Sequence, residues 1–385
     1  MRTRRGTRVR LAIVTALGAA AFVPHAAGAA QLARPMPRAL RVSGNALVDT
    51  AGRTVVLRGV NRSSPETLCM GAGLTSFFYG PTDAASVQAI RSWGANVVRI
   101  PVNEDCWLGR NGFPFSLTPA AYRSQIAAYA RLVEAAGLYV IIDVNFAEMS
   151  NALGTNASTG GAPMLDAAHG VELWQSIVAT FKDDTGVVLD LYNEPHDISW
   201  ACWRDGCTDP ASGSRYVGMK TLVAAVRAAG AKGPLILTGP SWGNDVSRWL
   251  EHVPADPLRN LVAGVHMYPD NACITRVCVD AQMVPVSRQV PLVVGEFGDN
   301  ACDGTFLELL TAWADANGIG YAAFTWNTPW GPCPGFHLIA SYDGTPTPVG
   351  AVYKAHLLAV TSATAVVART PAWRSAYRPH RTVRR

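Results

Sequence analysis

Eight short runs rich in Val, Ile and Leu recur along the chain, and they constrain its fold more than any other feature. Each run is almost continuously apolar, which is typical of strands buried on both faces of a parallel sheet. The runs occupy residues 55–61, 96–102, 139–145, 187–193, 235–241, 261–268, 291–298 and 321–327. Because both faces of such a sheet must be covered, we expect helices between the strands.

Amphipathic stretches with helical spacing lie between several of these runs, at residues 83–94, 119–137, 213–230 and 306–318. Several of them end in Gly, which is a common helix stop. Eight strands alternating with helices over roughly 290 residues predict a single-domain α/β fold, the closed (β/α)8 or TIM barrel, and disfavour an open doubly wound sheet. Residues 38–54 are expected to add a small hairpin that caps the barrel floor.

Residues 1–30 have the pattern of a secretory signal peptide. Arginines precede an apolar run that begins at Leu11 and ends near Pro24, and small residues then lead to an expected cut near Ala29 or Ala30. The apolar run is too short to span a bilayer comfortably, so an uncleaved anchor is the less favoured alternative. We therefore expect a secreted, extracellular protein with no stable membrane insertion after cleavage.

The formal net charge of +5 is concentrated at the two ends of the chain. Five arginines lie in the signal-like segment, and residues 361–385 hold six arginines and no acidic residue. The body between them is acidic overall, which gives no reason to expect a nucleic-acid partner. The C-terminal stretch is predicted to be a basic, disordered tail.

Eight cysteines in an exported chain predict disulfides. Two pairs are close enough in sequence to close local loops, and the other two pairs follow only by elimination, since sequence alone does not fix connectivity. The pairs considered are Cys202 with Cys207, Cys273 with Cys278, Cys69 with Cys106, and Cys302 with Cys333. A zinc site is the alternative, but no C-x-x-C pair or H-E-x-x-H motif supports it.

Polar residues collect at the C-terminal ends of the apolar runs, and these ends form the reactive rim of a (β/α)8 barrel. Glu194 directly follows the fourth run and Glu296 lies in the seventh, so we expect them on roughly opposite sides of the barrel mouth. Either acid alone could be a solvated loop residue or a salt-bridge partner. Two facing carboxylates suit glycoside hydrolysis, in which one protonates the leaving oxygen while the other attacks or activates water.

Four motifs at these ends resemble those of glycoside hydrolase family 5, the cellulase family. They are LYNEPH (191–196), VHMYP (265–269), VVGEFG (293–298) and FTWN (324–327). N-E-P alone is a weak signal, but its combination with the other three at matching strand ends is specific. The resemblance covers about residues 40 to 360, and it implies that residues 38–360 form a glycoside hydrolase catalytic domain.

The resemblance implies a retaining mechanism with two catalytic residues. Glu194 would be the general acid/base, and Glu296 would be the nucleophile. Asn193 would bind the sugar 2-hydroxyl.

Five further substrate-binding or positioning residues follow from the same resemblance. Arg99 would hold Glu296 ionised, Tyr268 would hold and tune the same carboxylate, and His266 would contact Glu194 or the substrate. Trp326 would be the platform beneath the sugar at the cleavage point. Asn145 stands where the family usually has a His, and since Asn does not titrate near neutral pH, substrate choice and pH response could differ here.

We expect a monomeric endo-glycosidase that needs neither a cofactor nor a metal and that hydrolyses a β-1,4-glucan such as cellulose. Mannan, xyloglucan and β-1,3-glucan stay open as polysaccharide or oligosaccharide substrates, because subsite loops decide this choice. Several loop tryptophans could line the cleft, with core packing as the alternative for each. They are Trp107, Trp200, Trp203, Trp242 and Trp330.

Two other classes of function are weighed against this one. Residues 239–243, GPSWG, match the G-x-S-x-G nucleophile elbow of serine hydrolases, with Ser241 as nucleophile and His337 or His356 as base. No HGGG-type oxyanion stretch precedes the motif, which disfavours an esterase. A non-catalytic carbohydrate-binding barrel would be expected to lack a catalytic acid, whereas both are present.

Overall fold

The computed structural model describes residues 36–69, 76–110, 118–147, 161–299, 301, 303–329 and 336–362. Most of the residues in the predicted signal peptide and basic tail lie outside these ranges, as do Cys302, Cys333 and Trp330. No helix in the described ranges has the length and apolar character needed to cross a bilayer.

Eight parallel strands close into a barrel, which confirms the predicted (β/α)8 architecture. Each strand overlaps one of the eight apolar runs, and the strands follow one another around the barrel in chain order. They are β3 (Arg58–Asn61), β4 (Val97–Asn103), β5 (Tyr139–Phe146), β6 (Val187–Asp190), β9 (Leu235–Thr238), β10 (Leu261–Met267), β11 (Leu292–Phe297) and β12 (Gly320–Ala323).

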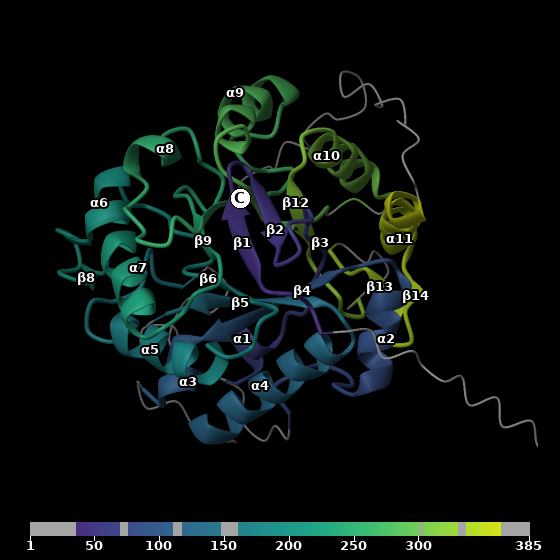
Figure 1. Ribbon diagram of the computed structural model, residues 1–385, viewed down its shortest axis with the longest axis horizontal. Coiled ribbons are helices and arrows are strands. Elements are labelled where there is room, and N and C mark those ends of the chain that lie inside the picture. Colours follow the sequence, from purple (N-terminus) through teal and green to yellow (C-terminus); the bar gives the residue numbers. More distant parts are fainter. Residues whose placement is uncertain are drawn as a thin grey trace, which may run out of the picture. The chain divides into compact units, whose positions relative to one another are not determined.

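Helices surround this barrel (Figure 1). Those at the four predicted positions are α2 (Ala84–Ser92), α4 (Pro119–Ala135), α7 (Met219–Ala228) and α10 (Thr305–Ala316). Further helices were not predicted from the sequence: α5 (Gly170–Phe181), α9 (Arg276–Ser287) and α11 (Pro348–Ser362), and the short helices α1 (Pro65–Leu68), α3 (Glu104–Leu108), α6 (Trp200–Asp205) and α8 (Trp249–His252). Besides the N-terminal hairpin, two small antiparallel pairs of described strands lie outside the barrel: β7 (Cys207–Thr208) with β8 (Arg215–Tyr216), and β13 (Ile339–Ser341) with β14 (Thr345–Pro346).

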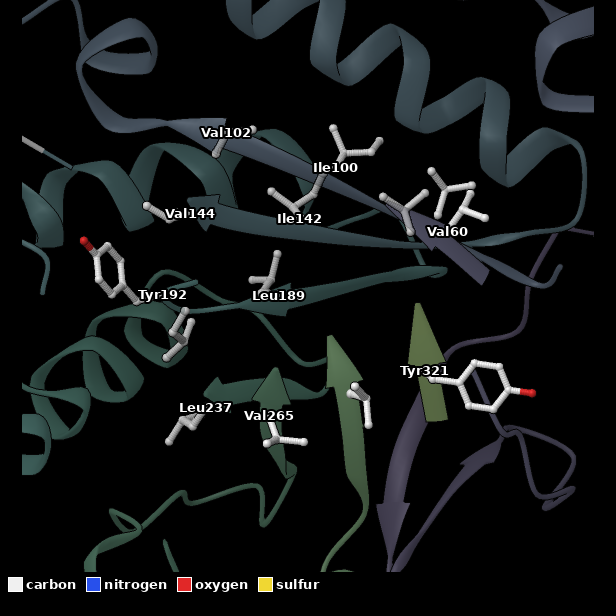
Figure 2. Close-up of a cluster of buried hydrophobic side chains, with 14 of the residues drawn as sticks. Val60, Ile100, Val102, Ile142, Val144, Leu189, Tyr192, Leu237, Val265 and Tyr321 are labelled. Atoms are coloured by element: carbon white, nitrogen blue, oxygen red, sulfur yellow. The ribbon is translucent and has the colours of Figure 1, made fainter. Parts of the chain in front are cut away.

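Side chains alternate between the two faces of each strand, as strand geometry requires. On β4, Val98, Ile100 and Val102 belong to the large outer core that includes the surrounding helices, and Figure 2 shows part of this cluster. Val97 belongs instead to a second, smaller cluster inside the barrel. Alternate residues of a strand therefore point outward, into the apolar layer beneath the helices, or inward, into the barrel interior.

The N-terminal hairpin closes the barrel floor, as predicted. Strands β1 (Leu40–Ser43) and β2 (Ala46–Asp49) pair antiparallel and lie inside the ring of helices in Figure 1. Leu40 and Leu47 pack against residues near the starts of the barrel strands, including Val97, Ile236 and Val293. This apolar floor leaves the opposite, C-terminal end of the barrel open for polar side chains.

Three disulfides join described residues, and each was among the pairs considered from the sequence. They are Cys69–Cys106, Cys202–Cys207 and Cys273–Cys278. The first ties the end of α1 to α3, and the other two close loops after β6 and β10. The three bonds therefore brace loops on the same side of the barrel as the polar rim.

Candidate active site

Above the apolar floor, the barrel interior holds one fully buried arginine surrounded by carboxylates. Nη1 of Arg99 lies 2.6 Å from Oε1 of Glu296, and its Nη2 lies 2.9 Å from Oδ1 of Asp143 and 3.1 Å from Oδ2 of Asp190. Asn61 accepts a further hydrogen bond from Nη1, at 3.0 Å. Arg99 thus joins the ends of β3, β5, β6 and β11 through one planar group.

Burial and charge act in opposite directions on this network. Burial raises the pKa of Asp143 well above its ordinary value, and it also raises the pKa of Asp190, with Arg99 opposing the shift in both. Burial disfavours the charged guanidinium too, but the surrounding carboxylates outweigh that effect and raise the pKa of Arg99. Arg99 is therefore a permanent positive charge next to Glu296.

Glu296 is held through both of its carboxylate oxygens. Arg99 donates to Oε1, and the hydroxyl of Tyr268 donates to Oε2 at 2.8 Å. Burial raises the pKa of Glu296, but the charges of His266 and Arg99 and the hydrogen bond from Tyr268 together lower it below its ordinary value. Glu296 is consequently a fixed, ionised carboxylate with 5% of its surface exposed, as a nucleophile requires.

Glu194 faces this carboxylate from the loop after β6. Its side chain is 24% exposed, and its Oε1 lies 2.9 Å from Nδ1 of His266, whose side chain is completely buried. A carboxylate oxygen of Glu194, a ring nitrogen of His266 and a carboxylate oxygen of Glu296 lie within 4.8 Å of one another. The structure therefore brings together the two acids that the sequence placed at the ends of separate strands.

The two predicted asparagines lie in the network around the acids. Asn193 accepts a hydrogen bond from Nη2 of Arg99 at 2.8 Å. Asn145 is 8% exposed, and its amide donates to Oδ2 of Asp143 at 3.2 Å. Asn145 is therefore one contact removed from Arg99, through Asp143.

Trp326 does not form the sugar platform that the family resemblance implies. Its ring is 1% exposed and meets Trp93 edge to face at 4.7 Å, so neither face is open to a ligand. Phe324, two residues earlier, is partly exposed and lines a cavity after β12 together with Phe336. The aromatic surface near this strand end thus comes from phenylalanines, because Trp326 turns into the core.

An exposed aromatic ring on the loop after β9 packs against the segment that follows Glu194. The rings of His196 and Trp242 stack in parallel at 3.6 Å, and Trp242 is 37% exposed. Ser241 and Trp242 have φ values of 60° and 59°, a left-handed conformation that is uncommon outside glycine. This turn sets Trp242 against the residue that follows Glu194 and Pro195.

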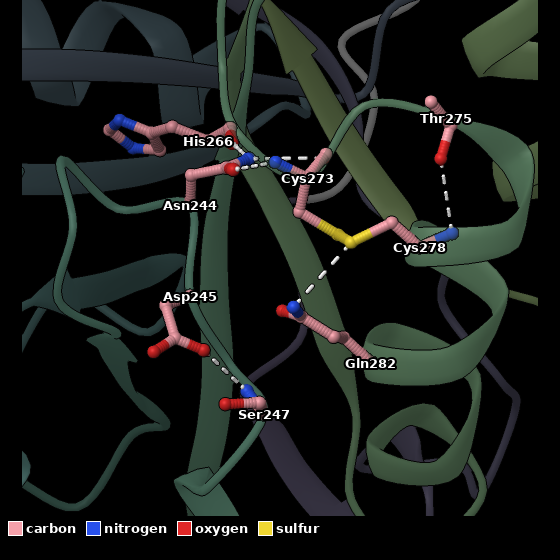
Figure 3. Close-up of a disulfide and its surroundings, with 8 residues drawn as sticks. All are labelled: Asn244, Asp245, Ser247, His266, Cys273, Thr275, Cys278 and Gln282. Carbon is pink, nitrogen blue, oxygen red and sulfur yellow. Dashed lines mark hydrogen bonds between the residues drawn. A yellow bond between two sulfur atoms is a disulfide. The ribbon is translucent and has the colours of Figure 1, made fainter.

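The Asn244 side chain helps to fasten this loop to β10 (Figure 3), alongside a backbone hydrogen bond from the N–H of His266 to the carbonyl of Gly243 at 2.9 Å. Nδ2 of Asn244 donates to the carbonyl of His266 at 2.9 Å, and its Oδ1 accepts the N–H of Cys273 at 2.8 Å. The Cys273–Cys278 disulfide closes the segment that follows. Asn244 therefore fixes the Trp242 turn relative to His266.

The esterase alternative does not assemble in this geometry. Within the described ranges, no hydrogen bond joins Ser241 to a histidine. His356 bonds Asp315 at 2.8 Å, and His337 lines the cavity between the loops after β3 and β12. Of the other loop tryptophans, Trp107, Trp200 and Trp203 are buried in the core.

Glu194, His266 and Glu296 are also the group of described side chains placed to share a cation. Both oxygens of Glu296 already accept hydrogen bonds, and the positive charge of Arg99 beside it would oppose a second cation. The donor set thus suits an ionised nucleophile better than a metal ligand.

Comparison with known proteins agrees with this geometry. The cellulase family, glycosyl hydrolase family 5, matches residues 48–329 of the chain. The chain belongs to glycosyl hydrolase family 5. It is therefore a glycoside hydrolase, an enzyme that hydrolyses O-glycosyl bonds.

Similar family 5 proteins carry both mannanase and glucanase names. The chain is 27% identical over 340 residues to a mannan endo-1,4-beta-mannosidase of Streptomyces lividans, covering 85% of this chain and 77% of the relative. It is also 27% identical to a beta-mannanase/endoglucanase A of Caldicellulosiruptor saccharolyticus, covering 79% of this chain and 21% of that protein. A beta-glucanase of Saccharophagus degradans has the same fold, with a TM-score of 0.65, 19% identity, and coverage of 86% of this chain and 95% of that one.

Several residues of the site were not predicted from the sequence. Asn61 and Asp143 were not given site roles, and Asp190 was read as part of an apolar run. A readable signal existed, since Arg99, Asp143 and Asp190 each interrupt an apolar strand, where an unpaired charge is costly. Glu66 and Phe324 carried no comparable signal.

The hydrogen bond from Tyr268 yields a prediction about pH. In Tyr268→Phe, Glu296 loses a donor that lowers its pKa, so the acidic limb of the profile of kcat/KM against pH should move upward by up to about one pH unit. Tyr353→Phe is the matched control, because it removes a buried hydroxyl that bonds the carbonyl of Gly59 instead. An unmoved acidic limb in Tyr268→Phe would contradict this account of how Glu296 stays ionised.

Proposed function

We propose that the chain is a secreted, retaining, endo-acting hydrolase of β-1,4-glucan, in which Glu296 is the nucleophile and Glu194 the general acid/base. The observation that carries this proposal is a doubly hydrogen-bonded, ionised Glu296 that has one carboxylate oxygen within 4.8 Å of a carboxylate oxygen of Glu194. Retaining glycosidases hold their carboxyl groups about 5–5.5 Å apart, whereas inverting ones leave about 6.5–9.5 Å for a water. The short separation therefore supports double displacement.

In the first step, an oxygen of Glu296 attacks the anomeric carbon while the bond to the leaving oxygen breaks. Glu194 gives its proton to that oxygen, and a glycosyl-enzyme ester forms on Glu296. Arg99 and Tyr268 hold the attacking carboxylate, and His266 orients Glu194. In the second step, Glu194 takes a proton from water, the water oxygen bonds to the anomeric carbon, and the ester bond to Glu296 breaks.

Two substrate classes have support, and β-1,4-mannan is the second candidate. Relatives named as mannosidases align over most of this chain, and relatives named as endoglucanases align over shorter segments. Both names describe enzymes acting within polysaccharides, which supports endo action here. Secretion is supported by the signal-like sequence of residues 1–30 and by disulfides, which persist in oxidising compartments.

Release of reducing sugar from a panel of polysaccharides tests the proposal. The purified protein with its disulfides intact should act on carboxymethylcellulose or mixed β-glucan at least about tenfold faster than on mannan, xyloglucan or laminarin. A reversed preference for mannan would select the second candidate. The absence of hydrolysis on all five polysaccharides would overturn the proposed function.

A further inference from the structure

A buried carboxyl group that the mechanism above does not use lies near the nucleophile. Glu66, on α1, is 7% exposed and lines a cavity of about 260 Å³ between the loops after β3 and β12. No cationic side chain within the described ranges pairs with it. Since buried acids are nearly always paired, an unpaired one facing a cavity needs another explanation.

The cavity has the chemistry of a sugar site. Phe324 and Phe336 supply apolar surface, while Glu66 supplies carboxyl oxygens that can bond hydroxyls. The side chains of Ser64 and Asn327, which also line the cavity, are already hydrogen-bonded within the protein. The volume of the cavity approaches the lower end of the range for small-molecule sites, about 300 Å³. Glycans present alternating apolar faces and hydroxyl edges, which match such a lining.

The cavity also adjoins the reacting centre. A side-chain carbon built on Gly298, two residues beyond Glu296, would meet Phe336 at 2.7 Å and the carbonyl of Phe324 at 3.0 Å. The ring of Phe336 also meets that of Tyr268 at 5.3 Å. The cavity wall therefore packs directly on the strand end and on the tyrosine that holds the nucleophile.

The order of strands around the barrel determines which part of the glycan chain would reach the cavity. Strands β12 and β3 are neighbours, and β6, which leads to Glu194, lies on the opposite side of the ring. The leaving oxygen must lie near the residue that protonates it, so the departing sugar extends toward Glu194. The part of the glycan that stays bonded to the enzyme then extends toward the cavity.

The local backbone is built to hold Glu66 in place. Ser64 has a φ of 134°, and its N–H donates to Oε2 of Glu66 at 2.7 Å. The carbonyl of Glu66 accepts from Asn103 at 3.0 Å, and the Cys69–Cys106 disulfide fastens the end of α1. Strained residues persist where surrounding structure holds them, and they cluster at functional sites.

We propose that Glu66 is a specificity-determining residue that binds hydroxyl groups of the sugar next to the cleaved unit, on the side away from Glu194. This inference rests on the proposed glycanase function. Burial and the nearby charge of Glu296 raise the pKa of Glu66 to about 7, although backbone N–H groups and Arg99 oppose this. Near neutral pH the group can therefore both donate and accept hydrogen bonds, as a sugar with several hydroxyls requires.

Aryl β-glycosides with one and two sugars, in the glucose and mannose series, test Glu66. For the unmodified enzyme, kcat/KM should be higher for the two-sugar glycoside than for the one-sugar glycoside, and the ratio of the two values is the gain from the second sugar. Glu66→Ala should lower this ratio about ten- to a hundredfold, which is the range expected for the loss of hydrogen bonds to a charged group. Glu66→Gln should recover part of the gain, because an amide still bonds hydroxyls.

Glu134 provides the matched control. It is also a buried glutamate that accepts one backbone N–H, from Gly186 at 2.8 Å, but it lies on α4 outside the barrel. Glu134→Ala should leave the gain from the second sugar unchanged. An unchanged gain in Glu66→Ala, or an equal loss in Glu134→Ala, would overturn the inference while the glycanase function stands. If the unmodified enzyme cut none of these glycosides or the polysaccharides above, both proposals would fail together.

Discussion

Replacing Glu296 by Gln should lower kcat on the preferred glycan on the order of 10⁴-fold or more, as removal of a covalent nucleophile does in other enzymes. The amide has nearly the same shape and can still accept the hydrogen bond from Arg99, so the fold and glycan binding should survive. It carries no negative charge and cannot form the glycosyl ester. Initial rates and oligosaccharide affinity by calorimetry, measured on the same preparation, check both halves of this expectation.

Azide provides the stereochemical control for the assignment of the two glutamates. In Glu296→Ala, azide should attack an activated aryl β-glycoside from the face that the nucleophile has left, giving an α-glycosyl azide. In Glu194→Ala, azide should instead attack the glycosyl-enzyme, giving a β-glycosyl azide. Proton NMR of the products distinguishes the two anomers, and a β product from Glu296→Ala would contradict the assignment.

The barrel could be predicted because each of its strands is buried on both faces. That environment demands continuous apolar runs, and a run of this kind can be recognised without its neighbours. Helix α9 was harder, because Pro285 lies inside it and β-branched residues dilute its helical pattern. The apolar spacing of α5, which buries Leu173, Ile177 and Phe181, was readable but was not assigned.

The carboxylate pair could be predicted from strand ends, but the network beneath it could not. Strand parity places Arg99 and Asp143 in the barrel interior, yet only the closed ring shows that one guanidinium reaches carboxylates from several strands. The role of Trp326 was predicted wrongly for a similar reason. Strand β12 ends before this residue, so its side-chain direction is not set by the strand. No strand periodicity then tells which of Phe324 and Trp326 faces the open mouth.

Replacing Arg99 by Met should destabilise the fold by about 3–5 kcal/mol at neutral pH, the usual cost of leaving buried charges without their partner. The loss should shrink as the pH falls toward 4. Arg99 lowers the pKa of Glu296 and opposes the rise in the pKa values of Asp143 and Asp190, so its stabilising effect requires ionised carboxylates. Once these groups are protonated, the arginine has fewer charges to balance. Urea unfolding of both proteins at pH 7 and pH 4, with disulfides intact, measures the difference.

Arg227 offers a matched control for this experiment. Its side chain is also buried and pairs with Asp256 at 2.8 Å, but it lies on α7. Among the described residues, its other hydrogen bonds go to backbone carbonyls of Ala231, Gly233 and Asn260, away from the rim. Arg227→Met should lower stability while the kcat/KM of the folded enzyme stays unchanged. Arg99→Met should lose both stability and activity, because Glu296 loses the charge that keeps it ionised and the donor that fixes Oε1. Two results would contradict this account: a loss in the free energy of unfolding of less than about 1 kcal/mol at pH 7, or an equal loss at pH 4 and pH 7. Either result would mean that the guanidinium charge does not stabilise the strand ends of this barrel.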